Sequence, residues 1–155
     1  MRIGWGFDAH RIGPDGPMTI GGVLVDNDRG LIGTSDGDVA LHAVADAILG
    51  AAALGDLGTH FSSADEKWHG ADSADLLARV VEMAREAGLL VDSVDVTVVS
   101  ETVRIGPHRE AIRHRLAQIV AAPIDRISVK ATSTDGMGFI GRDEGIAAVA
   151  AVVLN

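Results

Sequence analysis

Apolar runs separated by glycine- and aspartate-rich segments predict alternating strands and helices along the chain. Several of these runs have the composition of β-strands, and one of them is broken by Gly21-Gly22, as expected for a hairpin or a bent strand. The strands are predicted at positions 2–7, 18–25, 94–100, 127–132 and 146–154.

Three further segments have the helical spacing of apolar residues. The segment at 39–54 is rich in alanine, and Asp38 is one of three polar residues before it that can cap its start. A second helix is predicted at 72–87, and Pro107 starts the third. The stretch at 55–70 is rich in glycine, serine and aspartate and is predicted to be a long loop.

The order of these elements indicates an α/β (α+β) fold, in which helices cover one side of a mixed β-sheet. The 155 residues are expected to form a single domain spanning 1–155, because the chain is too short for two domains of ordinary size. Hydrophobic residues make up 47% of the chain but aromatic residues only 3%, so the core must consist of Ala, Val, Leu and Ile.

Charge and composition exclude several classes of function. The net charge of −9 argues against nucleic acid as a partner, because binding to phosphate backbones depends on clustered Lys and Arg. The chain contains no cysteine, which excludes disulfides and thiolate metal sites. The longest apolar stretch, at 145–154, is too short to span a membrane, and no charged-then-apolar leader is present at the start. We therefore expect a soluble cytoplasmic protein.

Two histidines and an aspartate form a candidate metal site. Asp8 and His10 are two residues apart in an extended segment, so their side chains point the same way. His42 near the start of a predicted helix would complete a three-ligand site with a fourth position open to substrate, as catalytic zinc requires. Asp46 follows His42 by four residues, and two interpretations are open: it accepts the second imidazole N–H, or the two form an exposed helix pair.

The polar segment Thr132-Ser133-Thr134-Asp135-Gly136 has two interpretations as well. Its hydroxyls and backbone N–H groups suit phosphate oxygens, but an ordinary turn between two strands has the same composition. The glycine spacing at 136–141 matches a dinucleotide-binding loop, yet an apolar strand is predicted to follow where that loop needs a helix, which excludes nicotinamide binding. In the next turn, Arg142 and Glu144 either form an ion pair or are simply solvated.

Five motifs, taken together, resemble the 2-C-methyl-D-erythritol 2,4-cyclodiphosphate synthase family, the ring-closing enzymes of the non-mevalonate isoprenoid route. The resemblance covers essentially the whole chain, and the block at 35–58 is its most specific part. The motifs are Gly4-Trp-Gly-Phe-Asp8-Ala-His10, Ser35-Asp-Gly-Asp-Val-Ala-Leu-His42, Gly55-Asp56-Leu-Gly58, Gly70-Ala-Asp-Ser73 and Gly138-Phe-Ile-Gly-Arg142-Asp-Glu144-Gly.

The resemblance implies a homotrimer with active sites between adjacent subunits and two kinds of metal ion. A zinc ion would be held by Asp8, His10 and His42. A magnesium or manganese ion would bind with the substrate diphosphate, with Asp135 as its protein ligand. The threefold axis would enclose an apolar cavity lined by Phe139, with Arg142 near its end, and this cavity is a candidate site for an isoprenoid diphosphate.

The resemblance also implies the substrate contacts. The erythritol part would meet Ser35, Asp56 and Gly58. The cytidine part would meet the segment 100–106 and the hydroxyls of Thr132 and Ser133. Thr34 and Asp135 would take the catalytic positions. The full set assigned to substrate is Asp8, His10, Thr34, Ser35, Asp56, Gly58, Ser100, Arg104, Gly106, Thr132, Ser133, Thr134, Asp135, Phe139 and Arg142.

Four positions depart from the family pattern. Thr34 stands where histidine is usual and is predicted to lower activity or to shift its pH dependence. Asp135 stands where glutamate is more common, which shortens the second-metal ligand by one methylene. Val103-Arg104 replaces proline-lysine, so the cytidine loop keeps its cation but loses a rigid residue. Ser63 replaces a commonly acidic residue.

The implied reaction is the cyclisation of 4-diphosphocytidyl-2-C-methyl-D-erythritol 2-phosphate with release of CMP. The 2-phosphate attacks the β-phosphorus, and the metal ions offset the repulsion between anions. Two other interpretations are open. The chain could be a non-catalytic module that binds an isoprenoid diphosphate, with Thr34 marking lost turnover, or a metal-dependent phosphohydrolase on a similar site.

Overall fold

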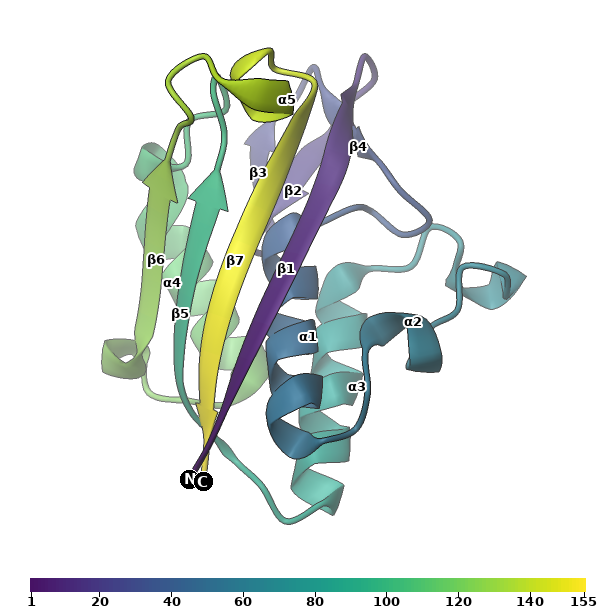
Figure 1. The fold of residues 1–155 in the computed structure, drawn as a ribbon, viewed down its shortest axis with the longest axis vertical. Helices are drawn as coiled ribbons and strands as arrows, with labels where there is room; N and C mark the ends of the chain where they lie inside the picture. Colours follow the sequence, from purple (N-terminus) through teal and green to yellow (C-terminus); the bar gives the residue numbers. More distant parts are fainter.

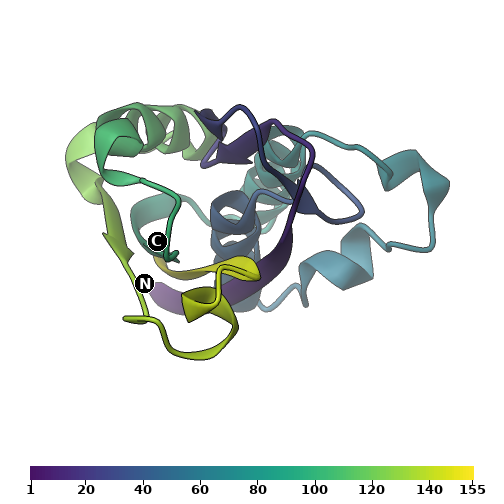
Figure 2. The ribbon, with the colours of Figure 1, turned by 90° about the horizontal axis from the view of Figure 1, so that it is seen from above.

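In the computed structural model, which describes residues 1–155, a five-stranded sheet carries the three long helices on one face (Figure 1, Figure 2). The strand order is β4-β1-β7-β5-β6; the β5–β6 pair is parallel and the other three pairs are antiparallel. The predicted mixed sheet with helices on one side is therefore confirmed. The strands of this sheet are β1 (Arg2–Gly13), β4 (Gly30–Ile32), β5 (Val91–Val99), β6 (Ile127–Thr132) and β7 (Gly145–Leu154).

The run at 18–25 folds into a hairpin of its own. β2 (Met18–Ile20) pairs antiparallel with β3 (Val23–Asp26), and Gly21 and Gly22 form the turn with φ values of 63° and 71°. These left-handed values explain the two glycines, because other residues adopt them only at a cost. The short strand β4 was not predicted, because three residues carry no clear alternation.

The alanine-rich helix α1 (Val39–Ala52) lies against β1 with almost no space between the two backbones. A Cβ atom added at Gly4 would lie 1.8 Å from the carbonyl oxygen of Ala47, and one at Gly6 would lie 2.0 Å from that of Ala43. Glycines on the strand and alanines on the helix therefore allow the close approach. This contact determines where the first turn of α1 sits relative to β1.

The start of α1 is held by the buried carboxylate of Asp38. It accepts hydrogen bonds from the backbone N–H groups of Ala40 and Leu41 at 3.1 Å each, which caps the helix. It also accepts from Gly21 at 2.8 Å and Gly22 at 2.7 Å, so the hairpin is joined to the helix. Burial raises the pKa of Asp38 to about 6, although these N–H groups favour the charged form.

The amphipathic helices α3 (Ser73–Glu86) and α4 (Arg109–Val120) complete the helical layer. Asp72 caps α3, and the one-turn helix η2 (Gly106–His108), which contains Pro107, leads into α4. Another one-turn helix, η3 (Ile124–Arg126), connects α4 to β6. The predicted helices are thus present at nearly the expected positions.

Two segments, one predicted as a loop and one as a turn, contain three short helices. The stretch 55–70 holds α2 (Leu57–His60) and the one-turn helix η1 (Glu66–Trp68), which begin at the capping carboxylates of Asp56 and Asp65. The turn before β7 holds α5 (Gly138–Gly141). The prediction of a long loop was incomplete because such short helices depend on local capping and show no apolar period.

The face of the sheet opposite the helices remains uncovered and carries large apolar side chains. On β1, Ile3, Trp5 and Phe7 are 72%, 65% and 48% exposed, and the rings of Trp5 and Phe7 stack with centroids 6.4 Å apart. None of the five aromatic residues of the chain is buried, so the core is aliphatic as predicted. No helix is both long and apolar enough to cross a membrane. The cytoplasmic location stays a prediction.

Candidate metal centre and substrate pockets

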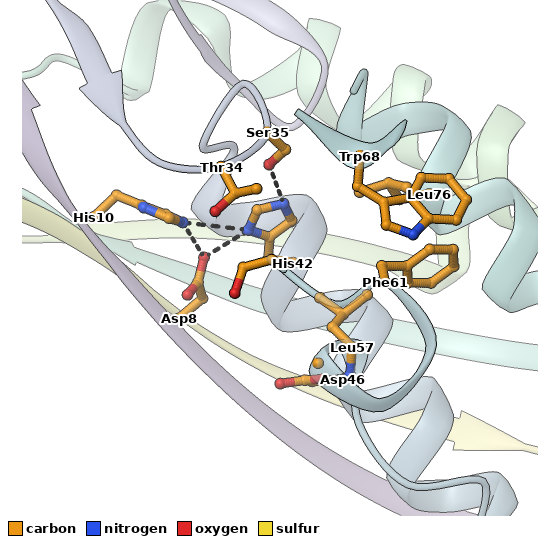
Figure 3. A pocket seen from close by; sticks show the side chains of 12 residues that line it. Asp8, His10, Thr34, Ser35, His42, Asp46, Leu57, Phe61, Trp68 and Leu76 are labelled. Atoms are coloured by element: carbon orange, nitrogen blue, oxygen red, sulfur yellow. Dashed lines mark hydrogen bonds and ion pairs between the residues drawn. The ribbon is translucent and has the colours of Figure 1, made fainter. Parts of the chain in front are cut away.

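Asp8, His10 and His42 meet in one cluster at the junction of β1 and α1 (Figure 3). Oδ2 of Asp8 lies 3.1 Å from Nε2 of His10 and 2.9 Å from Nδ1 of His42. The two imidazole nitrogens are 3.4 Å apart, and one ligand atom from each residue lies within 4.8 Å of the others. The structure therefore brings together the three residues that the sequence singled out.

The far side of each imidazole has a defined hydrogen-bond partner. Nδ1 of His10 lies 3.0 Å from the carbonyl oxygen of Ile32, which can only accept, so this nitrogen carries the hydrogen. Nε2 of His42 lies 2.8 Å from Oγ of Ser73, and the Ser73 hydroxyl donates to the carboxylate of Asp36. Ser73 therefore accepts from His42 Nε2–H. In its neutral form each histidine is thus held with a nitrogen lone pair facing the cluster, and with a proton on that nitrogen it donates to Asp8 instead.

These tautomers suit a divalent cation. Two imidazole lone pairs and a carboxylate oxygen converge, without any thiolate, and this donor set fits zinc or a similar borderline cation. Burial alone would raise the pKa of Asp8, but hydrogen bonds from His10 and His42 outweigh it and hold the pKa well below its usual range. The hydrogen bond to Asp8 raises the pKa of His10, against burial. A cation would replace the proton that this pair shares.

Asp46 has neither of the two roles considered for it. Its Oδ1 accepts a hydrogen bond of 2.8 Å from the backbone N–H of Leu57, so it holds the start of α2 against α1. Burial raises its pKa, opposed by that N–H. The partner of His42 Nε2 is Ser73 instead, together with Ser35 at 3.1 Å. Helix periodicity could not reveal this, because Ser73 belongs to a different helix.

The pocket that contains Asp8, His10 and His42, called the metal-cluster pocket below, has one apolar wall. Sequence reasoning did not find this wall. Leu57, Phe61, Trp68 and Leu76 line this wall, and the rings of Phe61 and Trp68 meet edge to face at 4.9 Å between centroids (Figure 3). The sequence did contain a signal for this wall, because Phe61 and Trp68, two of only five aromatic residues in the chain, both lie in the otherwise polar stretch 55–70.

Other predicted residues lie at the rim of this pocket or just outside it. Thr34, Ser35 and Gly58 are among its lining residues. The carbonyl oxygen of Thr34 accepts from the backbone N–H of Gly70 at 2.8 Å, which ties the segment before α1 to the loop before α3. Asp56 is exposed outside the lining, and its carboxylate accepts from the hydroxyl and the N–H of Thr59 at 2.8 Å each.

A second pocket lies where β5 and β6 end. The predicted cytidine residues that line it are Ser100, Arg104, Gly106, Thr132 and Ser133. Oγ of Ser100 accepts from the N–H of Val103 at 3.0 Å, so this serine shapes the loop. The same hydrogen bond explains why Val103 suits this chain: proline has no N–H to donate.

The remaining predicted residues lie on the exposed segment after β6. Asp135 has a left-handed φ of 52°, and its Oδ1 accepts from Ser133 at 3.2 Å. Thr134 donates to the carbonyl oxygen of Met137 at 2.6 Å, and Phe139 is 44% exposed. The ion pair considered for Arg142 is present, with Nε 2.8 Å from Oε1 of Glu144. Neither pocket includes Thr134, Asp135, Phe139 or Arg142.

Within one subunit the two pockets share no residue. The metal cluster is built on β1, beside the edge strand β4, whereas the second pocket is built on β5 and the opposite edge strand β6. The two groups of predicted substrate residues are therefore each assembled, but apart from one another.

Comparison with known proteins identifies the family. The model of the YgbB family matches residues 1–155. The chain belongs to the YgbB family. A relative from Salinibacter ruber, named 2-C-methyl-D-erythritol 2,4-cyclodiphosphate synthase, is 54% identical over all of this chain and 99% of its own length.

Solved structures agree with the YgbB assignment. A 2C-methyl-D-erythritol-2,4-cyclodiphosphate synthase in a CDP-bound form is 31% identical, with a TM-score of 0.90 over 99% of this chain and 100% of the other. The bifunctional IspDF from Campylobacter jejuni is 38% identical with a TM-score of 0.96; here 99% of this chain matches 42% of the larger one. The resemblance found in the motifs is thereby confirmed over the full length.

Proposed function

We propose that this YgbB-family chain converts 4-diphosphocytidyl-2-C-methyl-D-erythritol 2-phosphate to 2-C-methyl-D-erythritol 2,4-cyclodiphosphate and CMP, within the non-mevalonate isoprenoid route. The names of its relatives support this activity. The observation that carries the proposal is the cluster of Asp8, His10 and His42, whose nitrogen lone pairs are already turned toward one point. Such an arrangement is typical of a catalytic metal site that keeps a position open for substrate.

The reaction needs no side-chain nucleophile. An oxygen of the 2-phosphate attacks the β-phosphorus, and the bond from that phosphorus to the oxygen of the CMP group breaks. A phosphate monoester has its second pKa near 6, so at neutral pH it is largely a dianion and requires no general base. The barrier comes from repulsion between anions and from folding the substrate into a ring. The protein therefore contributes positioning and charge neutralisation.

Asp8, His10 and His42 would hold a zinc ion, and Asp135 would provide the protein ligand for magnesium or manganese. Bound there, the cations would supply Lewis-acid chemistry and would offset the charge of the diphosphate. The carboxylate of Asp135 is exposed and has only a hydroxyl partner from Ser133, so it is accessible to a cation. Two cations are consistent with a chain whose own net charge is −9.

The two pockets would take different parts of the substrate. The erythritol phosphate would lie beside the metal cluster, near Ser35 and Gly58 at the rim and with Asp56 close outside. The cytidine would lie in the pocket at the ends of β5 and β6, where Arg104 supplies a cation. CDP in the solved relative supports this second assignment. Thr34 would stand beside the reacting phosphates without an ionisable side chain.

A homotrimer would complete the site. Because the two pockets are apart within one subunit, a substrate that fills both requires the metal-cluster pocket of one subunit to meet the nucleotide pocket of a neighbour. The uncovered sheet face with Ile3, Trp5 and Phe7 provides apolar surface for such an assembly. The axis would then be lined by Phe139 and closed near Arg142, with room for an isoprenoid diphosphate.

The deciding experiment measures CMP release from the cytidylyl substrate by protein loaded with zinc and magnesium. Phosphorus NMR of the products is expected to show the cyclic diphosphate in an amount equal to the CMP. CMP with only linear phosphates would indicate a phosphohydrolase instead. A metal-loaded trimer that releases no CMP would indicate the non-catalytic binding module, with Thr34 as the first residue to restore to histidine.

A further inference from the structure

Three segments that are distant in sequence are joined by one polar triangle beside the nucleotide pocket. Arg29 precedes β4, Thr102 lies in the loop after β5, and Asp143 lies in the turn before β7. Nη1 of Arg29 lies 2.9 Å from Oγ1 of Thr102 and 2.9 Å from Oδ2 of Asp143. The Thr102 hydroxyl in turn donates to Oδ1 of Asp143 at 2.8 Å.

We propose that Arg29, Thr102 and Asp143 are positioning residues for the nucleotide, because they hold the pocket-forming loop in its binding conformation. The inference rests on the proposed function, since it assumes that the pocket at the ends of β5 and β6 takes cytidine. It assigns a role to three residues that had none, and only Asp143 among them lies within one of the motifs. None of the three lines the pocket, so they act through the loop.

The triangle is closed, and its members are fixed from outside. Each oxygen of Asp143 accepts one hydrogen bond, and the Thr102 hydroxyl accepts from Arg29 while it donates to Asp143. Nε of Arg29 donates to Oδ2 of Asp26 at 2.9 Å, and the Asp26 side chain is only 18% exposed. The guanidinium is therefore oriented before it meets the loop. A network of this kind holds geometry better than an isolated surface pair.

The backbone at Asp143 shows that the turn is built around this carboxylate. Its φ of 57° is left-handed, a conformation that glycine adopts freely and most other residues avoid. Aspartate tolerates it better than other side chains, at some energetic cost. The hydrogen bonds to Arg29 and Thr102 compensate for that cost.

The loop needs support at the place where the triangle attaches. Between the end of β5 at Val99 and the start of η2 at Gly106 there is no regular secondary structure. Val103 and Ile105 are anchored in the core, but Thr102 is exposed and lies next to Glu101, which lines the pocket. A preformed loop binds its ligand more tightly, because less conformational entropy is lost on binding.

The test compares Thr102→Val with Thr102→Ser. Valine keeps the shape and removes the hydroxyl, whereas serine keeps the hydroxyl. Calorimetric titration with CDP and magnesium is expected to show about fivefold weaker binding for the valine variant, the size of a lost surface network, and wild-type binding for the serine variant. In the CMP-release assay the valine variant is expected to raise KM by a similar factor with little change in kcat.

Asp143→Gly provides a second variant that does not depend on packing around Thr102. Glycine adopts the left-handed φ without strain, so the turn should fold, but both acceptor oxygens are lost. It is expected to weaken CDP binding at least as much as Thr102→Val. The matched control is Glu82→Gln, which removes the charge of the carboxylate that lies 2.6 Å from Arg79 on the exposed face of α3 and should leave CDP binding unchanged.

The outcomes separate this inference from the function on which it rests. If wild-type protein binds CDP and releases CMP but Thr102→Val and Asp143→Gly bind CDP normally, the positioning role is wrong and the function stands. Equal loss with Thr102→Ser would also contradict the role of the hydroxyl. If wild-type protein neither binds CDP nor releases CMP, the proposed function fails and this inference fails with it.

Discussion

The metal-cluster pocket and the proposed nucleotide pocket are built in opposite ways. Asp8, His10 and His42 project from a central strand and a buried helix, and the partners of both imidazoles are fixed by the surrounding structure. The nucleotide pocket is formed by loops at strand ends, and side chains such as Arg29 and Thr102 hold it from outside. The difference indicates that the proposed metal ligands are positioned by elements of the hydrophobic core. Binding of the nucleotide depends instead on how well the pocket-forming loops are ordered.

The distribution of aromatic residues follows the same division. Phe61 and Trp68 form the wall beside the metal cluster, and Trp5 and Phe7 lie on the uncovered sheet face. The core uses small aliphatic side chains, which let α1 lie directly on β1. That close packing brings His42 on α1 beside Asp8 and His10 on β1, and the aromatic surfaces are available for the proposed ligand and subunit contacts.

The largest expected effect comes from removing a metal ligand. His42→Ala should abolish zinc binding in elemental analysis and lower CMP release about a thousandfold, because the Lewis acid is lost. CDP should still bind with magnesium, since the nucleotide pocket contains no zinc ligand. His114→Ala, on the exposed side of α4, is the control. Zinc and turnover retained by His42→Ala would contradict the role of His42 as a zinc ligand, and loss of CDP binding would contradict the separation of the two pockets.

Loss of the trimer should have the next largest effect. Trp5→Glu places a carboxylate on the uncovered sheet face, and light scattering after gel filtration is expected to show monomers. CMP release should fall about a hundredfold, because the substrate is no longer positioned by two subunits. Zinc should remain bound, since its three ligands belong to one chain.

Leu24→Glu is the matched control for that substitution, because it changes a 46% exposed apolar residue on the hairpin strand β3. It should leave the oligomeric state unchanged. If Trp5→Glu remained trimeric and active, the sheet face would not be the contact between subunits, and the pockets would have to be joined in another way.

The sequence predicted the parts of the site that depend on short-range geometry. Two-residue spacing placed Asp8 beside His10, and the acidic turn before 39 placed His42 in the first turn of a helix. The role of Ser73 could not be predicted, because it depends on α3 packing beside α1 and not on any spacing within a helix. The failure with Asp46 has the same origin: the residue lies on the expected helix face, but the start of α2 takes its carboxylate.

The fold was predictable to a similar extent. Long strands and helices have clear periods, and the sheet with helices on one side followed from their order. The close contact of Gly4 and Gly6 with α1 could not be foreseen, because nothing in a strand pattern shows which backbone approaches it. The helices α2 and α5 have four residues each, too few for any period to be visible.

Substitution of Ser73, which accepts a hydrogen bond from His42, should have a smaller effect than substitution of His42 itself. Ser73→Ala leaves His42 with only Ser35 at Nε2 and frees the ring to take the other tautomer. Zinc affinity, measured by competition with a chromophoric chelator, is expected to fall by about tenfold to a hundredfold. Ser73→Thr keeps the hydroxyl and is expected to stay close to wild type. Equal affinities for Ser73→Ala and wild type would show that packing alone orients His42.

The smallest expected effect is a pH dependence in metal-free protein, and it distinguishes the charged metal cluster from the nucleotide pocket. The hydrogen bond to Asp8 raises the pKa of His10 above 6.5, its usual value. A raised folded-state pKa means that the stabilisation is fully present below 6.5 and is lost as the pH rises through the raised value.

The pKa of Asp8 lies below its usual range, so this carboxylate stays charged throughout the interval and does not add to the change. Because the pair is partly exposed, wild-type protein is expected to lose only about 1 kcal/mol between about pH 6 and about pH 9, relative to His10→Gln. Urea unfolding of chelator-treated protein measures this difference. Parallel pH profiles for the two proteins would show that the cluster is not held together by an ion pair before the metal arrives.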